Sequence, residues 1–268
     1  MDTLRAAIES VGVLGPGLPD WPTTACVLRD SSPWARSATV LPQPIALAGA
    51  ERRRTGAVVR LTLAVGLEAT GRSEIDPAKL PTVFSSSSGD GQNCHEICAT
   101  LASADRQLSP TRFHNSVHNA PAGYWGIATG ATAAANSLCA HDASFGAGLL
   151  EAICQVNVER THVLLIAYDT SYPEPMHSVR AIPDAFAVAL LLAPARAAAA
   201  LAHIELSLGD EPADHLQDAA LEQLRAAVPA ARSLPLLAHV ARGTSGRVCI
   251  DYLDGASIAL EVSRAPGS

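Results

Sequence analysis

Apolar runs of strand length alternate with helix-like stretches in this sequence, and this alternation restricts the fold more than any other feature. "THVLLIAYD" (161–169), "DAFAVALLLAP" (184–194) and "ALAHIELSLG" (200–209) predict strands. The last two fit neighbouring strands joined by a tight turn. Strands that alternate with helices indicate an α/β layered fold.

The helix predictions rest on apolar spacing and on residues that end helices. Gly71 suits the end of one predicted helix. Asp254 and Gly255 suit the turn of a hairpin over "GRVCIDYLDGASIALEVSR" (246–264). Helices are predicted over residues 2–10, 52–70, about 92–104, about 142–156 and within 214–228.

Composition excludes several classes of protein. The chain has 268 residues, 48% of them hydrophobic and 17% charged, which is typical of an ordered globular protein. A formal net charge of −7 argues against a nucleic-acid partner. The longest apolar run (181–203) is interrupted by prolines, an aspartate and an arginine, so no membrane insertion is expected. The absence of a signal-type segment and six irregularly spaced cysteines favour a cytoplasmic location.

Cys139 is the leading chemical candidate. In "GATAAANSLCAHDASFGAGLLEAI" (130–153), small residues lead to this cysteine, and an apolar helix follows. A strand running into a helix places the thiol near the helix N-terminus, where the thiolate is favoured. That placement suits an acyl-accepting nucleophile. A buried structural cysteine is the alternative.

Two further groups of residues have metal-ligand character. His114 and His118 are four residues apart and would share one face of a helix, but no HExxH pattern accompanies them. Cys94 and Cys98 are one helical turn apart beside His95, without a second Cys/His pair. A polar surface or interface patch is the preferred interpretation of the two histidines, and the lack of a second pair argues against a metal site at the cysteines. We therefore expect no metal and no organic cofactor.

Three segments together resemble the β-ketoacyl synthases, the condensing enzymes of thiolase fold. They are "VFSSSSGDGQN" (83–93), "LSPTRFHNSVHNAPAGYWGIATG" (108–130) and "NSLCAHDASFGAG" (136–148). The second segment matches the family pattern at Ser109, Pro110, Asn119, Ala122, Gly123 and Gly130.

The closer resemblance is to the ketosynthase-like chain length factors of aryl polyene pigment clusters. It covers about residues 25–195 and includes "YPEPMHSVRAIPDAFAVALLLAP" (172–194). It implies a single thiolase-like layered domain that corresponds to the N-terminal half of a ketosynthase. A shortened second half would occupy about residues 196–268.

The sequence departs from the family where catalysis is concerned. The histidine motifs of the second half are absent, and "HVARGTSG" (239–246) lacks their order. Counting from Ser109 and Pro110 without gaps places the nucleophile at Asp142, whereas three deleted residues place it at Cys139. Condensation also needs donors that stabilise the enolate. Cys139 alone would at most be acylated.

The resemblance therefore implies a non-catalytic subunit that pairs with a full-length β-ketoacyl synthase and is served by an acyl carrier protein. Its dimer interface would lie on a strand from about Thr132 to Leu138, and Arg52, Arg53 and Arg54 form a candidate carrier-docking patch. The expected tunnel walls, for which core packing is the alternative, are Phe113, Trp125 and Phe145. The expected interface residues are His114, Asn115, His118, Asn119, Thr132, Ala134, Asn136 and Leu138.

Two other functions stay open. One is a reduced but active condensing enzyme or acyltransferase that uses Cys139 as a homodimer. The other is a purely structural stabiliser of the partner.

Overall fold

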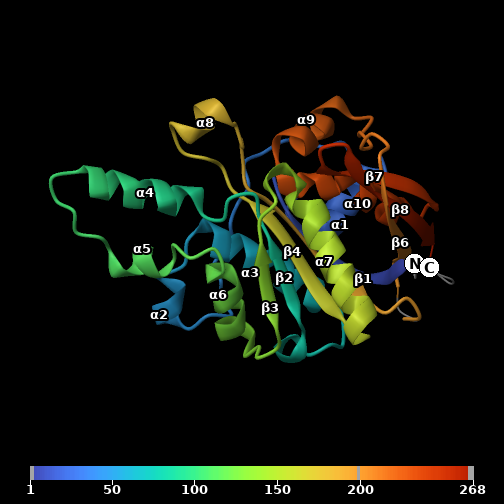
Figure 1. Ribbon diagram of the computed structural model, residues 1–268, viewed down its shortest axis with the longest axis horizontal. Coiled ribbons are helices and arrows are strands. Elements are labelled where there is room, and N and C mark those ends of the chain that lie inside the picture. Colours follow the sequence, from blue (N-terminus) through green and yellow to red (C-terminus); the bar gives the residue numbers. More distant parts are fainter. Residues whose placement is uncertain (1–2, 198–199, 265–268) are drawn as a thin grey trace.

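The predicted apolar strands all belong to one mixed sheet (Figure 1). The structure is a computed structural model that describes residues 3–197 and 200–264, and within these residues eight strands form the sheet. The strand order is β3-β2-β4-β5-β1-β6-β8-β7. The strands are β1 (Leu4–Leu14), β2 (Thr82–Ser85), β3 (Ala135–Leu138), β4 (Val163–Asp169), β5 (Phe186–Ala193), β6 (Ala202–Gly209), β7 (Gly246–Leu253) and β8 (Ala256–Arg264). β2 is parallel to β3 and β4, whereas every other neighbouring pair is antiparallel.

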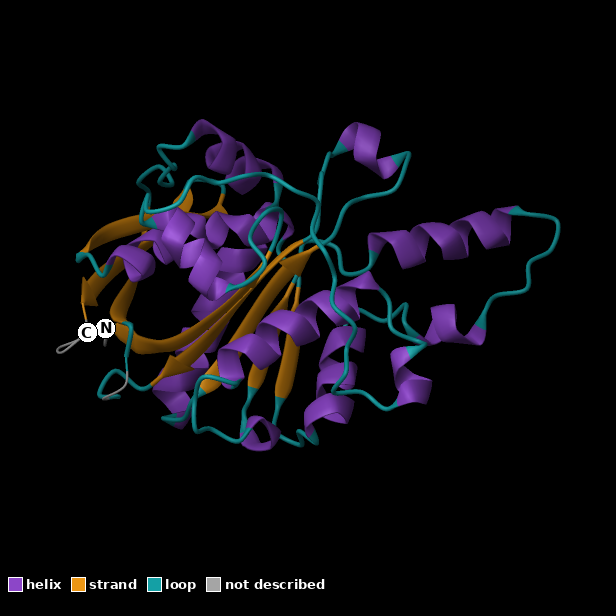
Figure 2. Cartoon of the chain, turned by 180° about the vertical axis from the view of Figure 1, so that it is seen from behind, coloured by secondary structure: helices purple, strands orange, loops and turns teal. Residues whose placement is uncertain are grey.

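The helices cover both faces of this sheet, as Figure 2 shows from behind. α3 and α6 pack on one face, and α1, α7 and α10 pack on the other. The α-helices are α1 (Trp21–Leu28), α2 (Gly49–Arg52), α3 (Ala57–Thr70), α4 (Gly91–Ala102), α5 (Pro110–His114), α6 (Ala120–Thr129), α7 (Ser144–Glu159), α8 (Met176–Val179), α9 (Ala219–Ala227) and α10 (Leu234–Arg242). Short 3-10 turns occupy Pro77–Lys79, His141–Ala143 and Pro229–Ser233.

Alternation of side chains along β4 explains the two cores. Leu164, Ile166 and Tyr168 join the core beneath α3, whereas Val163 and Leu165 join the core beneath α7. All of β4 is buried, because helices cover both of its faces. The predicted α/β layered fold is confirmed.

The hairpin and several helix ends agree with the sequence. β7 and β8 meet at Asp254–Gly255, where Gly255 has φ +72°. α3 ends at its predicted C-cap, Gly71, but it begins at Ala57 and not at Arg52. α4 begins where the Asp90 carboxylate accepts the N–H of Asn93 at 2.9 Å.

The predicted helix over residues 2–10 is wrong. These residues belong to β1, an inner strand that pairs with β5 on one side and with β6 on the other. The prediction that β5 and β6 are neighbours is wrong for the same reason, since β1 lies between them. Ala6, Ala7 and Ile8 are all fully buried, so β1 lacks the alternating pattern that identifies a half-exposed strand.

A projecting arm is the least packed part of the described chain. It consists of α4, α5 and the segment between them, and it extends away from the sheet in Figures 1 and 2. Only Gly91 and Asn93 are buried in α4, and no residue of α5 is buried. Among the described residues, no helix has the length and apolar character needed to cross a bilayer.

Candidate functional site

The carboxyl ends of the three parallel strands meet at one end of the sheet. β2 ends at Ser85, β3 ends at Leu138 and β4 ends at Asp169. Ligand sites of open α/β sheets form outside the carboxyl ends of the strands. The loops that follow these three strands are therefore the candidate site.

Cys139 is the first residue after β3, and it is exposed. Its thiol donates a hydrogen bond to the carbonyl oxygen of Ser87 at 3.0 Å. α7 begins at Ser144, whose hydroxyl oxygen accepts the N–H of Ala140 at 3.1 Å. The predicted strand, turn and helix are present, with a 3-10 turn between the cysteine and α7. In the part of the chain that the structure describes, no imidazole hydrogen-bonds to this thiol.

The turn before α7 contains the other nucleophile position that the sequence allows, Asp142. The residue before it, His141, has φ +52°, in the left-handed region that residues other than glycine rarely occupy. The Asp142 carboxylate forms ion pairs with Arg180 and, at 3.3 Å, with Arg232. These guanidinium groups hold the carboxylate in a structural role. The His141 ring also lies beside this carboxylate, with Nδ1 3.6 Å from an Asp142 oxygen, whereas no imidazole is hydrogen-bonded to Cys139 among the described residues.

Asp169 is the last residue of β4 and is buried. Its carboxylate accepts the N–H of Ser87 at 2.9 Å, the hydroxyl of Ser87 at 2.6 Å and the N–H of Ala230 at 2.8 Å. Burial raises the pKa of Asp169 from 3.8 to about 6, while the bonds from Ser87 and Ala230 and the charge of Arg180 oppose the rise. The carboxylate thus joins the loop after β2 to the C-terminal part of the chain.

Sequence reasoning missed this carboxylate. The available signal was an aspartate that ends an otherwise apolar strand. Its partners are 82 and 61 residues away in sequence, so spacing alone could not show them. The network continues from Ser87 through Tyr172 at 3.3 Å to Arg180 at 3.1 Å, and from there to Asp142.

The predicted interface residues of the arm are not on one helix. α5 ends at His114, so the expectation that His114 and His118 share a helical face is wrong. The side-chain amide of Asn115 donates to the Arg54 carbonyl at 2.7 Å, and its oxygen accepts the Tyr124 hydroxyl at 3.2 Å. The His114 ring meets Tyr124 edge-on at 6.2 Å.

His118 and Asn119 complete this group. The His118 ring lies near Gly89, and its Nε2 is buried with no hydrogen-bond partner among the described residues. Burial lowers the pKa of His118. Asn119 is exposed at the start of α6. The four predicted interface residues from His114 to Asn119 therefore lie between the end of α5 and the start of α6.

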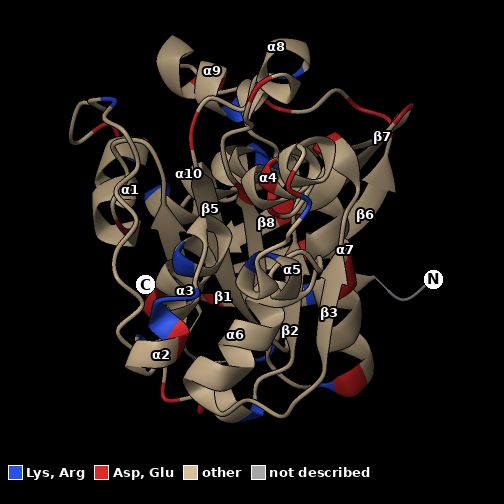
Figure 3. Ribbon diagram, turned by 90° about the vertical axis from the view of Figure 1, so that its left-hand side faces the viewer, with Lys and Arg blue, Asp and Glu red and all other residues tan. Residues whose placement is uncertain are grey.

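The predicted interface strand is shorter than expected and forms an edge of the sheet. Thr132 and Ala134 precede β3, while Asn136 and Leu138 lie in it. Only Leu138 packs against a core, and Thr132, Ala134 and Asn136 are exposed. β3 pairs with β2 alone within the described residues. Neither β3 nor α6 carries a Lys, Arg, Asp or Glu, so both are tan in Figure 3.

The three predicted tunnel residues are far apart in the fold. Trp125 is buried in the core beneath α3, where its ring packs on Gly66 and Ile166. Phe145 is buried in the core beneath α7, on the opposite face of the sheet. Phe113 lies on the arm and is 67% exposed. The structure does not bring these side chains together.

The remaining thiols and histidines are dispersed. Cys94 and Cys98 lie one helical turn apart on α4, as their spacing predicts. Both are exposed. His239, in the last turn of α10, shares a hydrogen bond of 3.2 Å between its Nδ1 and the hydroxyl of Thr244, the residue after the Gly243 C-cap. Among the described residues, no three His, Cys, Asp or Glu side chains are grouped as metal ligands.

The fold is similar to that of ketosynthase assemblies. A chain of the ketosynthase ApeO in complex with its chain length factor ApeC, from Xenorhabdus doucetiae, is 23% identical with a TM-score of 0.72. The match covers 96% of this chain and 99% of that one. A chain of the ishigamide ketosynthase/chain length factor is 16% identical with a TM-score of 0.73, over 98% of this chain and 100% of that one.

The fold is also similar to that of a longer β-ketoacyl synthase chain. A β-ketoacyl synthase from Burkholderia phymatum STM815 is 14% identical with a TM-score of 0.59, over 90% of this chain and 71% of that one. No curated protein matches the sequence significantly. The model of the beta-ketoacyl synthase N-terminal domain matches residues 29–251. The predicted resemblance and the thiolase-like ketosynthase fold are thus confirmed, and the chain belongs to the beta-ketoacyl synthase family.

Proposed function

We propose that this chain is a non-catalytic subunit of chain length factor type that pairs with a full-length β-ketoacyl synthase. The observation that carries the proposal is the open edge of β3. This edge is uncharged, Ala135 and Asn136 are exposed on it, and it ends directly before Cys139. An exposed strand edge offers unpaired N–H and C=O groups to another chain.

Exposed apolar side chains on α6 and on the projecting arm support the same proposal. Leu101, Phe113 and Val117 belong to the arm and its junction, and Ile127 lies on α6, with exposed fractions of 47% to 67%. Large apolar side chains that are exposed to solvent are typical of a protein interface. Phe113 is the predicted tunnel residue best placed to reach a partner, because the other two are enclosed in the cores.

The chemistry of the site supports the absence of catalysis. The Cys139 thiol is bonded to a neutral carbonyl, and Asp142 is held by two arginines. Condensation requires a base or donor at the nucleophile. In the proposal the partner supplies this chemistry, and the present chain limits the length of the growing acyl chain.

The proposal extends to the carrier and the product. The acyl chain would arrive on an acyl carrier protein in the cytoplasm, and aryl polyene elongation is the pathway class that the sequence resemblance suggests. Of the expected carrier-docking patch, Arg53 and Arg54 are exposed, whereas Arg52 donates to the Leu47 carbonyl at 3.0 Å. Arg53 is thus the most available member, since Arg54 pairs with Glu51 at 3.2 Å.

A reduced condensing enzyme is the second candidate. The exposed Cys139 thiol, placed beside the turn of His141, is the observation that favours it. In that case the chain alone would accept an acyl group from its carrier.

Intact-protein mass spectrometry separates the two functions. The chain is mixed with aryl-enoyl acyl carrier protein, alone and with a candidate ketosynthase, and Cys94→Ala serves as the matched control for Cys139→Ala. We expect a one-to-one complex in native spectra and acylation of the ketosynthase only. Acylation of this chain that Cys139→Ala abolishes and Cys94→Ala preserves would instead establish the enzyme.

A further inference from the structure

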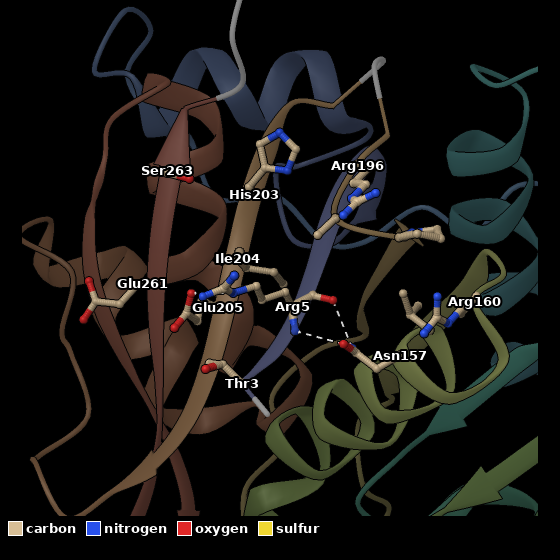
Figure 4. A pocket seen from close by; sticks show the side chains of 13 residues that line it. Thr3, Arg5, Asn157, Arg160, Arg196, His203, Ile204, Glu205, Glu261 and Ser263 are labelled. Carbon is tan, nitrogen blue, oxygen red and sulfur yellow. Dashed lines mark hydrogen bonds and ion pairs between the residues drawn. The ribbon is translucent and has the colours of Figure 1, made fainter. Parts of the chain in front are cut away.

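A second candidate site lies at the other end of α7, away from Cys139. It is a cavity of about 870 Å³ between the C-terminus of α7, the start of β1 and the strands β6 and β8 (Figure 4). α7 has 16 residues and is therefore about 24 Å long, with Cys139 near its first turn. The cavity is thus separate from the β3 edge, and its volume is in the range of small-molecule sites.

The cavity has positive groups without counterions. Arg5 is paired with Glu205 at 2.7 Å, and Glu261 is paired at 2.8 Å with Arg247, which also binds Glu211 at 2.9 Å. Neither carboxylate of the lining is an ion-pair partner of Arg160 or Arg196. Arg160, Arg196 and His203 complete the charged lining, and none of them has an ion pair or side-chain hydrogen bond within the described residues. In a chain of net charge −7, this local excess of positive charge is unusual.

One wall of the cavity is held in place by the fold. The Asn157 amide donates to the Arg5 carbonyl at 2.9 Å, and its oxygen accepts the Arg5 N–H at 3.3 Å. Dashed lines in Figure 4 mark this pair. It ties the last turn of α7 to β1, so Arg160 follows a fixed helix end. A preformed wall lowers the entropy that a ligand loses on binding.

Arg160 occupies a backbone position where glycine is the usual residue. It is the C-cap of α7 with φ +53° and ψ 37°, in the left-handed region. Helices commonly end with glycine in this conformation, because a Cβ is unfavourable there. A cation near a helix C-terminus is favourable in itself, but that effect does not require the cation at the left-handed residue. The left-handed backbone at Arg160 therefore has a cost that the helix end itself does not explain.

We propose that this cavity binds a phosphate group through Arg160 and Arg196, with His203 beside them. A guanidinium group can donate two parallel hydrogen bonds to phosphate oxygens, so arginine is a common residue at phosphate sites. The hydroxyls of Thr3 and Ser263 also line the cavity and provide further donors. The cavity has room for more than inorganic phosphate, so the proposed ligand is the phosphate monoester of a small organic molecule.

Calorimetry of the full chain tests the site. Ribose 5-phosphate, inorganic phosphate and ribose are titrated into the wild type and into Arg160→Gln, Arg196→Gln and the control Arg36→Gln. Arg36 is exposed and lies outside the cavity lining. We expect each cavity variant to weaken ribose 5-phosphate binding at least about tenfold, with no change for Arg36→Gln.

Arg160→Gly separates binding from folding. It removes the guanidinium group and relieves the left-handed backbone, so we expect phosphate binding to be lost while the melting temperature stays constant or rises. Equal binding of inorganic phosphate and the ester would identify the free anion as the ligand of the same site. No saturable binding of either, or equal weakening by Arg36→Gln, overturns the proposal. None of these results depends on the ketosynthase partner.

Discussion

β3 and β7 are the two edges of one sheet, but they meet their surroundings in different ways. The edge of β7 is covered by residues 210–216: Asp214 donates its N–H to the Cys249 carbonyl at 2.9 Å and accepts the Cys249 N–H at 2.8 Å. Arg247, also on β7, binds Glu211 of the same segment at 2.9 Å. β3 has no such cover among the described residues, and it has no charged side chain.

This difference shows which edge is available to another chain. Proteins usually protect exposed edges with loops or charges, because a free edge promotes association. Here the protection is present at β7 and absent at β3. The open edge is also the one that ends directly before Cys139. The difference between the two edges therefore makes β3 the expected interface.

The largest expected effect comes from adding charge to the open edge. Ala135→Lys together with Asn136→Lys should weaken the complex with the ketosynthase at least about a hundredfold, roughly 3 kcal/mol, since two cations would be buried against the partner. Asn136 already donates to Glu151 at 2.8 Å, so lysine can keep that contact and the fold. Leu253→Lys on β7 is the matched control. Equal affinity of all three proteins in native mass spectrometry would remove β3 from the interface.

The next effect concerns Asp169, which connects the two sides of the molecule. Because its folded pKa of about 6 exceeds 3.8, the folded protein takes up a proton before the unfolded chain does as the pH falls. As the pH falls from about 6 to about 4, the free energy of unfolding of the wild type should therefore rise relative to that of Asp169→Asn, by up to roughly 3 kcal/mol. Urea unfolding of both proteins across this range measures the difference. Parallel pH profiles would show that Asp169 has an ordinary pKa.

Uncovering the protected edge should have a smaller effect. Asp214→Ala removes the carboxylate that accepts the Cys249 N–H, and it should reduce the free energy of unfolding by about 1–2 kcal/mol. The loosened cover should also increase self-association, which light scattering detects. Asp210→Ala is the control, since its exposed carboxylate takes no part in the pairing. Unchanged scattering with lower stability would mean that the backbone pair alone protects β7.

The smallest expected effect is at Phe113. Phe113→Ser should weaken the partner complex about fivefold, near 1 kcal/mol, and should leave the melting temperature unchanged because the side chain is 67% exposed. Val179→Ser on α8, which replaces a side chain that is 89% exposed, serves as the control. A lower melting temperature for Phe113→Ser would assign this ring to the stability of the arm.

Local chemistry explains which parts of this fold the sequence could predict. The turn at Asp254–Gly255, the end of α3 at Gly71 and the strand before Cys139 depend on neighbours in sequence, and the structure contains all three. β1 was out of reach, because its small and apolar residues are buried on both faces and imitate a helix. The Asp169 network depends on groups brought together only by the finished sheet.

The position of β1 has a consequence for how the chain folds. β1 contributes Ala7 to a pair with Ala193 and Ile8 to a pair with Ala202, so this strand needs partners that lie 186 and 194 residues later in the chain. At about 5–20 residues per second, a ribosome adds those partners roughly 10–40 s later. During that interval an apolar strand has no native neighbour. A chain that stalls before β5 exposes this strand to aggregation, so chaperone binding during synthesis should be strongest there.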